Sequence, residues 1–293
     1  MRGIRASFWV AVALFSASAS AEPPSSPEAA QQPATVTVEA QRQRELIQQQ
    51  ISTYVSAIAT PNRGEALLRW QSPVCPAVMG LSAAEGEFLL ERLSKFAMDA
   101  GAPVAPKDCG PNLLVIVSPE PGVLLKKWWA RNPRLFQDDK GIGGVKRFLN
   151  STQPIRAYYN ANLDCEGGAY KVRGGGTYVP SHCTSALGSK LSWAVIRVIY
   201  SVIVIVDLKQ ISDLTIGQLT DYVTLIGLAQ IREDPNPGAA PTILHLFTDK
   251  GTTRPEGLSD WDQSFLKALY TSNTESVMQL AVIKDRLYGD LAH

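Results

Sequence analysis

The chain has 293 residues, of which 45% are hydrophobic and 19% are charged, and its 28 Lys and Arg nearly balance its 27 Asp and Glu. This composition excludes a wholly disordered protein and a protein with several membrane spans. A formal net charge of +1 without a basic block also argues against nucleic-acid binding, which needs clustered Lys and Arg to neutralise phosphates.

Residues 1–21 have the pattern of a signal peptide. Arg2 and Arg5 precede an apolar run from Ala6 to Phe15, and positions 19–21 supply the small residues of a cleavage site. A membrane anchor needs roughly 20 apolar residues, and this run is shorter. We therefore expect an exported protein of the periplasm or the cell exterior, without a membrane span in its mature part.

The rest of the chain is expected to form a short tether and one domain. Residues 22–35 are rich in Pro, Ser, Gln and Ala, which is typical of a flexible linker. Residues 36–293 then form a single globular domain, with a helical N-terminal part at 40–110 and a second part at 111–293. In the first part, apolar residues recur at helical spacing between Gln41 and Ala59.

The four cysteines all lie in the mature part, and an exported protein can oxidise them. Of the three possible pairings, we favour Cys75 with Cys109 and Cys165 with Cys183, because each pair closes a self-contained segment. A zinc site that uses His182 with Cys183 is disfavoured, since adjacent residues rarely chelate one ion and no CxxC or HxxxH spacing occurs. We expect neither a metal nor another cofactor.

Alternating helices and strands follow, and the helices carry clear end signals. Ser82 and Glu85 form a capping box, and Gly101 suits the end of the helix that this box opens. The same signal recurs at Thr215 with Gln218, where it opens a helix that ends at Gly227. Two further helices are predicted at the C-terminal side, one capped by Ser259 with Asp262 and one from Val277 to Leu287.

Three strands and two loops are predicted between these helices. Asn112–Val117 and Val202–Val206 are apolar runs of strand length, typical of strands covered on both faces. Ile155–Leu163 alternates and carries β-forming residues, which predicts an edge strand. The glycine runs Gly141–Gly144 and Gly174–Gly176 are expected to be loops, because neither has the spacing of a phosphate-binding motif.

Two surface features are compatible with binding. Lys126–Arg131 interleaves basic and aromatic residues, as single-strand and cell-wall binders do. Tyr158 and Tyr159 lie on the predicted edge strand, where a peptide could bind by strand addition. We favour the ordinary explanations, which are a helix with one buried Trp for the first feature and an edge strand with half-buried tyrosines for the second.

The C-terminal half resembles a known family. Its order of elements resembles the C-terminal half of metzincin-type zinc peptidases. This order is a strand, a helix ending in Gly227-Leu228, a turn-rich segment and then Leu258-Ser259-x-x-Asp262 to Leu269-Tyr270. A nearer resemblance is to a family of uncharacterised exported bacterial proteins that are related to the zincins by fold. It rests on Asp221–Leu228 and on a block from Pro73 to Leu113. The resemblance implies a zincin-like α/β (α+β) fold, a mixed sheet with packed helices.

The metzincin motif HExxHxxGxxH has lost its metal ligands in this chain. With Gly227 on the glycine of the motif, the resemblance implies that Thr220, Thr224 and Gln230 stand at the ligand positions and Asp221 at the catalytic glutamate. Hydroxyl and amide groups do not hold catalytic zinc, which prefers imidazole, carboxylate or thiolate. The mature chain also has only three histidines, His182, His245 and His293, so few residues could serve as the histidine of a catalytic triad.

The leading hypothesis from the sequence is therefore a non-catalytic, exported binding or interaction protein with a degenerate metallopeptidase-like fold. Its candidate binding residues are Thr220, Asp221, Thr224, Tyr158 and Tyr159, and its partner is a peptide or another protein. The alternative is a hydrolase that uses Asp221 with an unidentified cleft partner and without zinc. A structural protein of the cell envelope is a third possibility.

Overall fold

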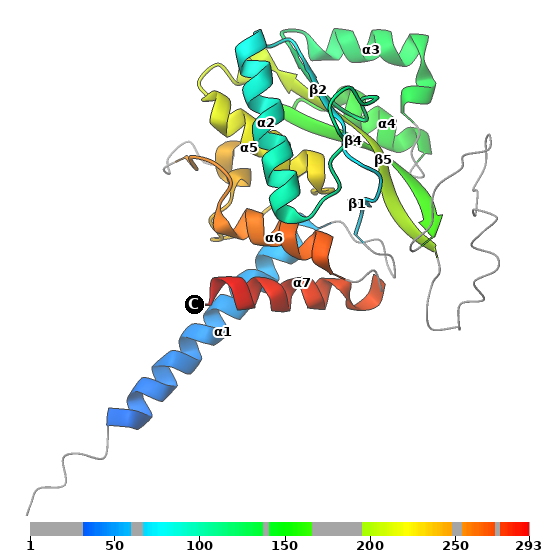
Figure 1. Ribbon diagram of the computed structural model, residues 1–293. Coiled ribbons are helices and arrows are strands. Elements are labelled where there is room, and N and C mark those ends of the chain that lie inside the picture. Colours follow the sequence, from blue (N-terminus) through cyan, green and yellow to red (C-terminus); the bar gives the residue numbers. More distant parts are fainter. Residues whose placement is uncertain are drawn as a thin grey trace, which may run out of the picture. The chain divides into compact units, whose positions relative to one another are not determined.

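The computed structural model describes residues 32–59, 67–136, 141–165, 195–247, 254–272 and 276–292 (Figure 1). The chain divides into two units, Met1–Arg42 and Gln43–His293. In the first unit, residues 32–42 form the beginning of helix α1 (Gln32–Ile58). This helix begins within the segment that the composition predicts to be a tether. The remainder of α1 and all other described elements belong to the second unit.

The second unit contains a five-stranded sheet in which most strands are parallel. The strands are β1 (Arg69–Trp70), β2 (Pro76–Met79), β3 (Leu113–Ser118), β4 (Ile155–Cys165) and β5 (Val195–Asp207). The long strand β5 pairs in parallel with β1 and β3 and antiparallel with β4, and β2 pairs in parallel with β3. The mixed α/β class is thus confirmed. The N-terminal part, expected to be helical, also contributes β1 and β2 to the sheet.

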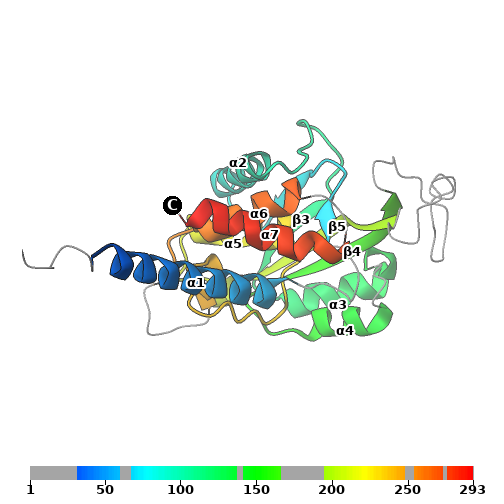
Figure 2. The ribbon, with the colours of Figure 1, turned by 90° about the horizontal axis from the view of Figure 1, so that it is seen from below.

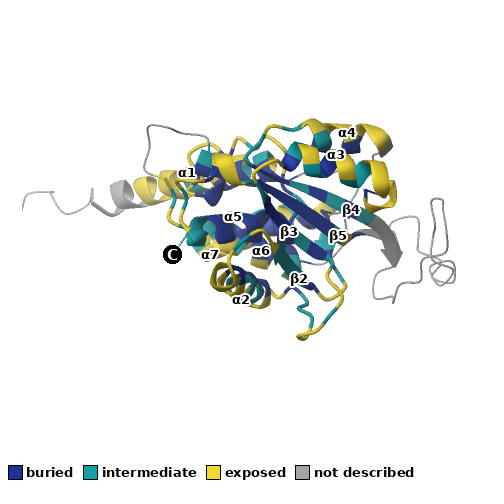
Figure 3. Cartoon of the chain, turned by 90° about the horizontal axis from the view of Figure 1, so that it is seen from above, coloured by how far each residue is buried: buried dark blue, intermediate teal, exposed yellow. Residues whose placement is uncertain are grey.

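Helices cover both faces of this sheet (Figures 1 and 3). They are α2 (Ala83–Ala100), α3 (Pro121–Arg131), α4 (Gly141–Asn150), α5 (Ile216–Leu228), α6 (Asp260–Thr271) and α7 (Ser276–Leu291), with 3-10 turns at Pro133–Leu135, Leu208–Gln210 and Ile243–Phe247. The larger core lies on the side of α2, α5 and α6, and the smaller core on the side of α3 and α4. Burial on both faces explains why β3 and β5 are continuous apolar runs.

The three predicted capping boxes and the glycine at the end of α2 are confirmed. Complete capping boxes occur at Ser82, at Thr215 and at Ser259, and Gly101 adopts a left-handed conformation with φ of 83°. In the view from below, α6 and α7 lie side by side (Figure 2). Lys284 of α7 donates to Ser52 Oγ of α1 at 2.9 Å, which ties the C-terminal helix to the second half of α1.

The glycine run at 141–144 differs from its prediction as a loop, because it forms the beginning of α4. Val145 and Phe148 of this helix are only 2% and 5% exposed and belong to the smaller core. Tertiary burial of this kind outweighs the low helix propensity of glycine, which amounts to about 1 kcal/mol per residue. The second glycine run, 174–176, lies outside the described residues.

Cys75 and Cys109 form the predicted disulfide, with their Cα atoms 6.0 Å apart. The bridge joins the residue before β2 to the segment before β3. Beside it, the Cys75 carbonyl accepts hydrogen bonds from the amides of Asn112 and Leu113. The second pairing, Cys165 with Cys183, stays a prediction, because residue 183 lies outside the described residues. None of the helices described is both long and apolar enough to cross a lipid bilayer.

Candidate functional site

The face of α5 that carries Thr220 and Thr224 is buried inside the fold. Both side chains are fully buried, and each hydroxyl donates to the helix backbone, Thr220 to the Ile216 carbonyl at 2.7 Å and Thr224 to the Thr220 carbonyl at 2.8 Å. Gly227 lies on the same face by helical spacing. A Cβ atom at Gly227 would come within 3.2 Å of Leu113 on β3, so the small residues on this face allow the close approach.

Asp221 is also fully buried, and its carboxylate is held from two sides. Arg92 of α2 forms a bidentate pair with it, with Nε 2.5 Å from Oδ1 and Nη2 2.8 Å from Oδ2. The Leu258 amide donates to Oδ2 at 2.8 Å. The hydrogen bond to Asp221 raises the pKa of Arg92. Such charge-assisted bidentate pairs are among the stronger hydrogen bonds in proteins, so this pair links α2 to α5.

These residues do not fit a metal site. The two threonine hydroxyls donate to backbone carbonyls, and the Asp221 carboxylate already has a cationic partner. Within the described ranges, no group of three or more His, Cys, Asp or Glu side chains could hold a metal ion. The structure buries Thr220, Asp221 and Thr224, three of the candidate binding residues, inside the fold.

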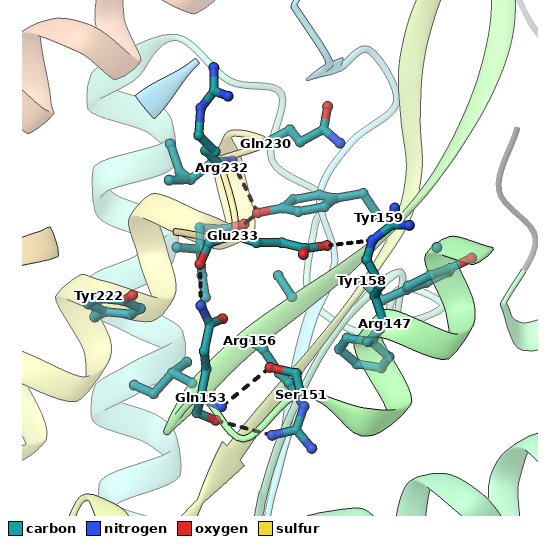
Figure 4. A pocket seen from close by; sticks show the side chains of 16 residues that line it. Arg147, Ser151, Gln153, Arg156, Tyr158, Tyr159, Tyr222, Gln230, Arg232 and Glu233 are labelled. Atoms are coloured by element: carbon teal, nitrogen blue, oxygen red, sulfur yellow. Dashed lines mark hydrogen bonds and ion pairs between the residues drawn. The ribbon is translucent and has the colours of Figure 1, made fainter. Parts of the chain in front are cut away.

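A pocket of about 260 Å³ lies elsewhere, along β4, between α4 and the C-terminal end of α5 (Figure 4). We call it the edge pocket. It brings together Tyr158 and Tyr159, both predicted as binding residues, with Gln230, which the resemblance places at the third ligand position. Tyr158 is packed in the smaller core, whereas Tyr159 packs against the larger core. The pocket thus straddles the edge of the sheet.

Tyr159 connects β4 to the end of α5. Its hydroxyl lies 2.7 Å from the Ile226 carbonyl and 3.1 Å from the Ala229 carbonyl, either of which can accept its proton, and it accepts from the Ile231 amide at 3.4 Å. Burial raises the pKa of Tyr159. The neutral hydroxyl therefore satisfies backbone groups at the end of the helix and fixes the wall of the edge pocket that follows α5.

The outer side of β4 carries a row of backbone groups that point away from β5. The Asp207 amide donates to the Pro154 carbonyl at 2.8 Å, and Ile155 lies opposite Val206. Hydrogen-bonded and non-bonded pairs alternate along an antiparallel ladder, so the backbone groups of Ile155, Ala157 and Tyr159 point away from β5. In the part of the chain that the structure describes, these groups have no hydrogen-bond partner on that side. We call them the β4 edge.

Arg156 is a polar residue of the edge pocket that the sequence analysis missed. It is only 6% exposed, and its Nη1 donates to the Gln153 carbonyl at 3.1 Å. Its guanidinium carbon lies 5.8 Å from the centre of the Phe148 ring. Burial lowers the pKa of Arg156, and the Asp207 charge opposes this effect. The one available signal was an arginine on the same face of the strand as Tyr158.

The two walls of the edge pocket are bridged next to the beginning of β4. The Gln153 side chain donates to the Glu233 carbonyl, and the Glu233 carboxylate lies 3.9 Å from Arg147 of α4. Arg232 points away from this bridge, since its guanidinium donates to carbonyls at the end of α1 (Figure 4). The bridge therefore consists of one hydrogen bond and one exposed ion pair.

Comparison of the chain with protein-family models, with curated proteins and with solved structures found no match. The functional assignment therefore rests on the geometry of the edge pocket and of the buried face of α5.

Proposed function

We propose that this protein is a non-catalytic, exported binding protein with a degenerate metallopeptidase-like fold, and that it binds an extended peptide along the β4 edge. The observation that carries the proposal is the row of outward-facing backbone groups at Ile155, Ala157 and Tyr159, which borders the edge pocket. A peptide in extended conformation supplies complementary amides and carbonyls, which is how strand addition produces affinity.

The size of the edge pocket supports a narrow ligand. Its volume of about 260 Å³ is below the usual range for sites of drug-sized ligands, about 300 to 1,000 Å³. An extended chain that lies along the strand needs room for only some of its side chains. Tyr222 and Ile226 of α5 and Phe148 of α4 supply apolar contacts on either side of the β4 edge.

The absence of catalysis in this proposal rests on Asp221. A general base must come within hydrogen-bond reach of the proton that it removes. The Asp221 carboxylate is buried and bound to Arg92 and to the Leu258 amide. Hydrolysis through Asp221 would require this pair to separate, and we therefore do not retain the hydrolase as a second candidate.

The fold and export parts of the proposal have separate support. Peptidase-like folds bind substrates along a sheet edge, and here an antiparallel edge strand precedes the strand that leads to α5. The signal-peptide pattern at residues 1–21 and the Cys75–Cys109 disulfide suit an oxidising compartment.

The test is selection from a random heptapeptide library, followed by fluorescence anisotropy with the selected peptide carrying fluorescein at its N-terminus. Ala157→Pro removes one outward amide and leaves the β4–β5 ladder intact, which edge strands tolerate. We expect this variant to fold and to bind at least about tenfold more weakly, since it loses a backbone hydrogen bond and the close approach of the peptide.

The matched control places proline on the opposite edge of the sheet, at Val78 of β2. The Cys75 carbonyl faces β3, so the alternation along a parallel strand turns the Val78 amide outward. Val78→Pro should bind the peptide like the unmodified chain. Failure to select any peptide, or equal binding by a folded Ala157→Pro variant, would contradict strand addition at the β4 edge.

A further inference from the structure

We propose that the edge pocket recognises the C-terminal carboxylate of the bound peptide and that Arg156 receives it. This inference rests on the proposed strand addition, and it adds the chemical class of the ligand group and the direction of the peptide. Two independent observations carry it: the charge balance of the edge pocket and the bridge next to the beginning of β4.

The charge balance leaves Arg156 as a buried cation without an acidic partner at ion-pair distance among the described residues. Its Nε–H is buried and has no hydrogen-bond acceptor in the part of the chain that the structure describes. Asp207 acts on Arg156 through its charge and not through a hydrogen bond. The Asp207 carboxylate accepts from the Lys209 amide and the Gln210 side chain. A buried cation is costly unless it is paired, and a carboxylate matches the planar guanidinium in two parallel hydrogen bonds.

The other charged groups of the edge pocket are already engaged. Arg147 pairs with Glu233, and both side chains are more than half exposed. The guanidinium of Arg232 is bound to carbonyls at the end of α1. A ligand carboxylate could therefore pair with Arg156, the cation of the pocket that has no acidic partner among the described residues. It would not compete with the Arg147–Glu233 pair.

The bridge sets the place where the peptide ends, and a terminal carboxylate at Arg156 then sets its direction. A strand that adds antiparallel to β4 has its C-terminus beside Ile155, where β4 begins. There the Gln153 side chain reaches across to the Glu233 carbonyl (Figure 4). A peptide that continued past Ile155 would have to break this contact, whereas a peptide that ends there would not. Because the guanidinium of Arg156 binds the Gln153 carbonyl, it lies at this same end.

A carboxylate can come from a chain terminus or from an Asp or Glu side chain, and the peptide probes separate these sources. One probe is the selected heptapeptide with a free C-terminus, the second is its C-terminal amide, and the third is the amide with Glu as its last residue. We expect amidation to weaken binding about tenfold or more, as loss of a charge-assisted hydrogen-bond pair does, and the added Glu not to restore it.

Arg156→Gln should bind the acid and the amide equally, because it lacks the cation, whereas Arg131→Gln at the exposed end of α3 should keep the preference. If the Gln variant folds poorly, Arg156→Lys is measured in its place. It retains the charge and should keep part of the preference for the free acid. Binding of acid and amide with equal affinity by the unmodified chain would overturn this inference but leave strand addition standing. Binding of neither peptide would overturn both this inference and strand addition. If the amide that ends in Glu bound as tightly as the free acid, recognition of a terminal carboxylate would be overturned.

Discussion

The Asp221 carboxylate is enclosed by groups that bind its oxygens and by a glycine that leaves room for it. Arg92 and the Leu258 amide bind its oxygens, and Gly257 has no side chain that would enter the same space. A resemblance to a peptidase motif identified this residue, and the structure gives it a role in joining α2, α5 and the segment before α6. The contribution of Asp221 is therefore to stability, and substitutions can measure it.

Asp221→Ala should lower the free energy of unfolding by about 2 to 3 kcal/mol. Breaking a fully buried ion pair costs about 3 to 5 kcal/mol, and the value here is smaller because the Arg92 side chain is 38% exposed. Urea denaturation measures the difference. Asp213→Ala, which removes the exposed pair with Arg254, is the control and should leave stability nearly unchanged. An equal effect of the two substitutions would show that the Asp221 pair does not hold the helices together.

Gly257→Ala should destabilise the protein by about 1 to 3 kcal/mol, which is typical of overpacking. A Cβ atom at this position would overlap Asp221 Oδ2, so either the carboxylate or the segment before α6 must move. Gly110→Ala is the matched loop control, because no atom lies within 4 Å of its added Cβ. Equal midpoints of thermal unfolding for the two variants would contradict the tight packing around Asp221.

At the scale of elements, the sequence predicted most of the helices and strands but not the burial of the polar face of α5. Capping boxes such as Ser82 with Glu85 are local signals, and so is the apolar run of β3. The short strand β1 has only two residues, and its pairing with β5 is non-local, so no periodicity could show it. The close approach of Gly227 to Leu113, which lies far away in the sequence, is also non-local.

The protein should lose stability at alkaline pH because Tyr222 of α5 is partly buried. Burial raises the pKa of Tyr222 to about 12, whereas an unfolded tyrosine has a pKa of about 10. The folded state favours the neutral phenol, so this contribution is fully present below about pH 10 and is lost as the pH rises through about 12. In urea denaturation from pH 8 to 11.5, the chain should lose more stability than Tyr222→Phe. Parallel curves for the two proteins would contradict this prediction.

At the scale of the whole molecule, one sheet connects segments that the sequence analysis treated as separate parts. β2 comes from the N-terminal part and pairs with β3, and the Cys75–Cys109 bridge closes the connection between them. The edge pocket arises from the same assembly, because α4, β4 and the segment after α5 meet only in the folded chain. Arg156 could not be singled out from the sequence, since its importance depends on these neighbours.

Removing the Cys75–Cys109 disulfide should lower the free energy of unfolding by about 3 to 4 kcal/mol. The chain-entropy model gives this value for a loop closed over a separation of 34 residues. The change is Cys75→Ala with Cys109→Ala, and thermal and urea unfolding measure it. Because the bridge lies away from the edge pocket, peptide affinity should persist at temperatures where the variant is folded. Loss of binding by the folded variant would show that the bridge also shapes the β4 edge.

The central claim is that a peptide pairs with the outer side of β4, and amide hydrogen exchange tests it most directly. Addition of the selected heptapeptide should slow exchange at the outward amides of Ile155, Ala157 and Tyr159, whereas Arg156 and Tyr158 already face β5. We predict protection that alternates along the strand and reaches at least about tenfold at saturation. Tight binding without added protection of Ala157 and Tyr159 would contradict strand addition at this edge.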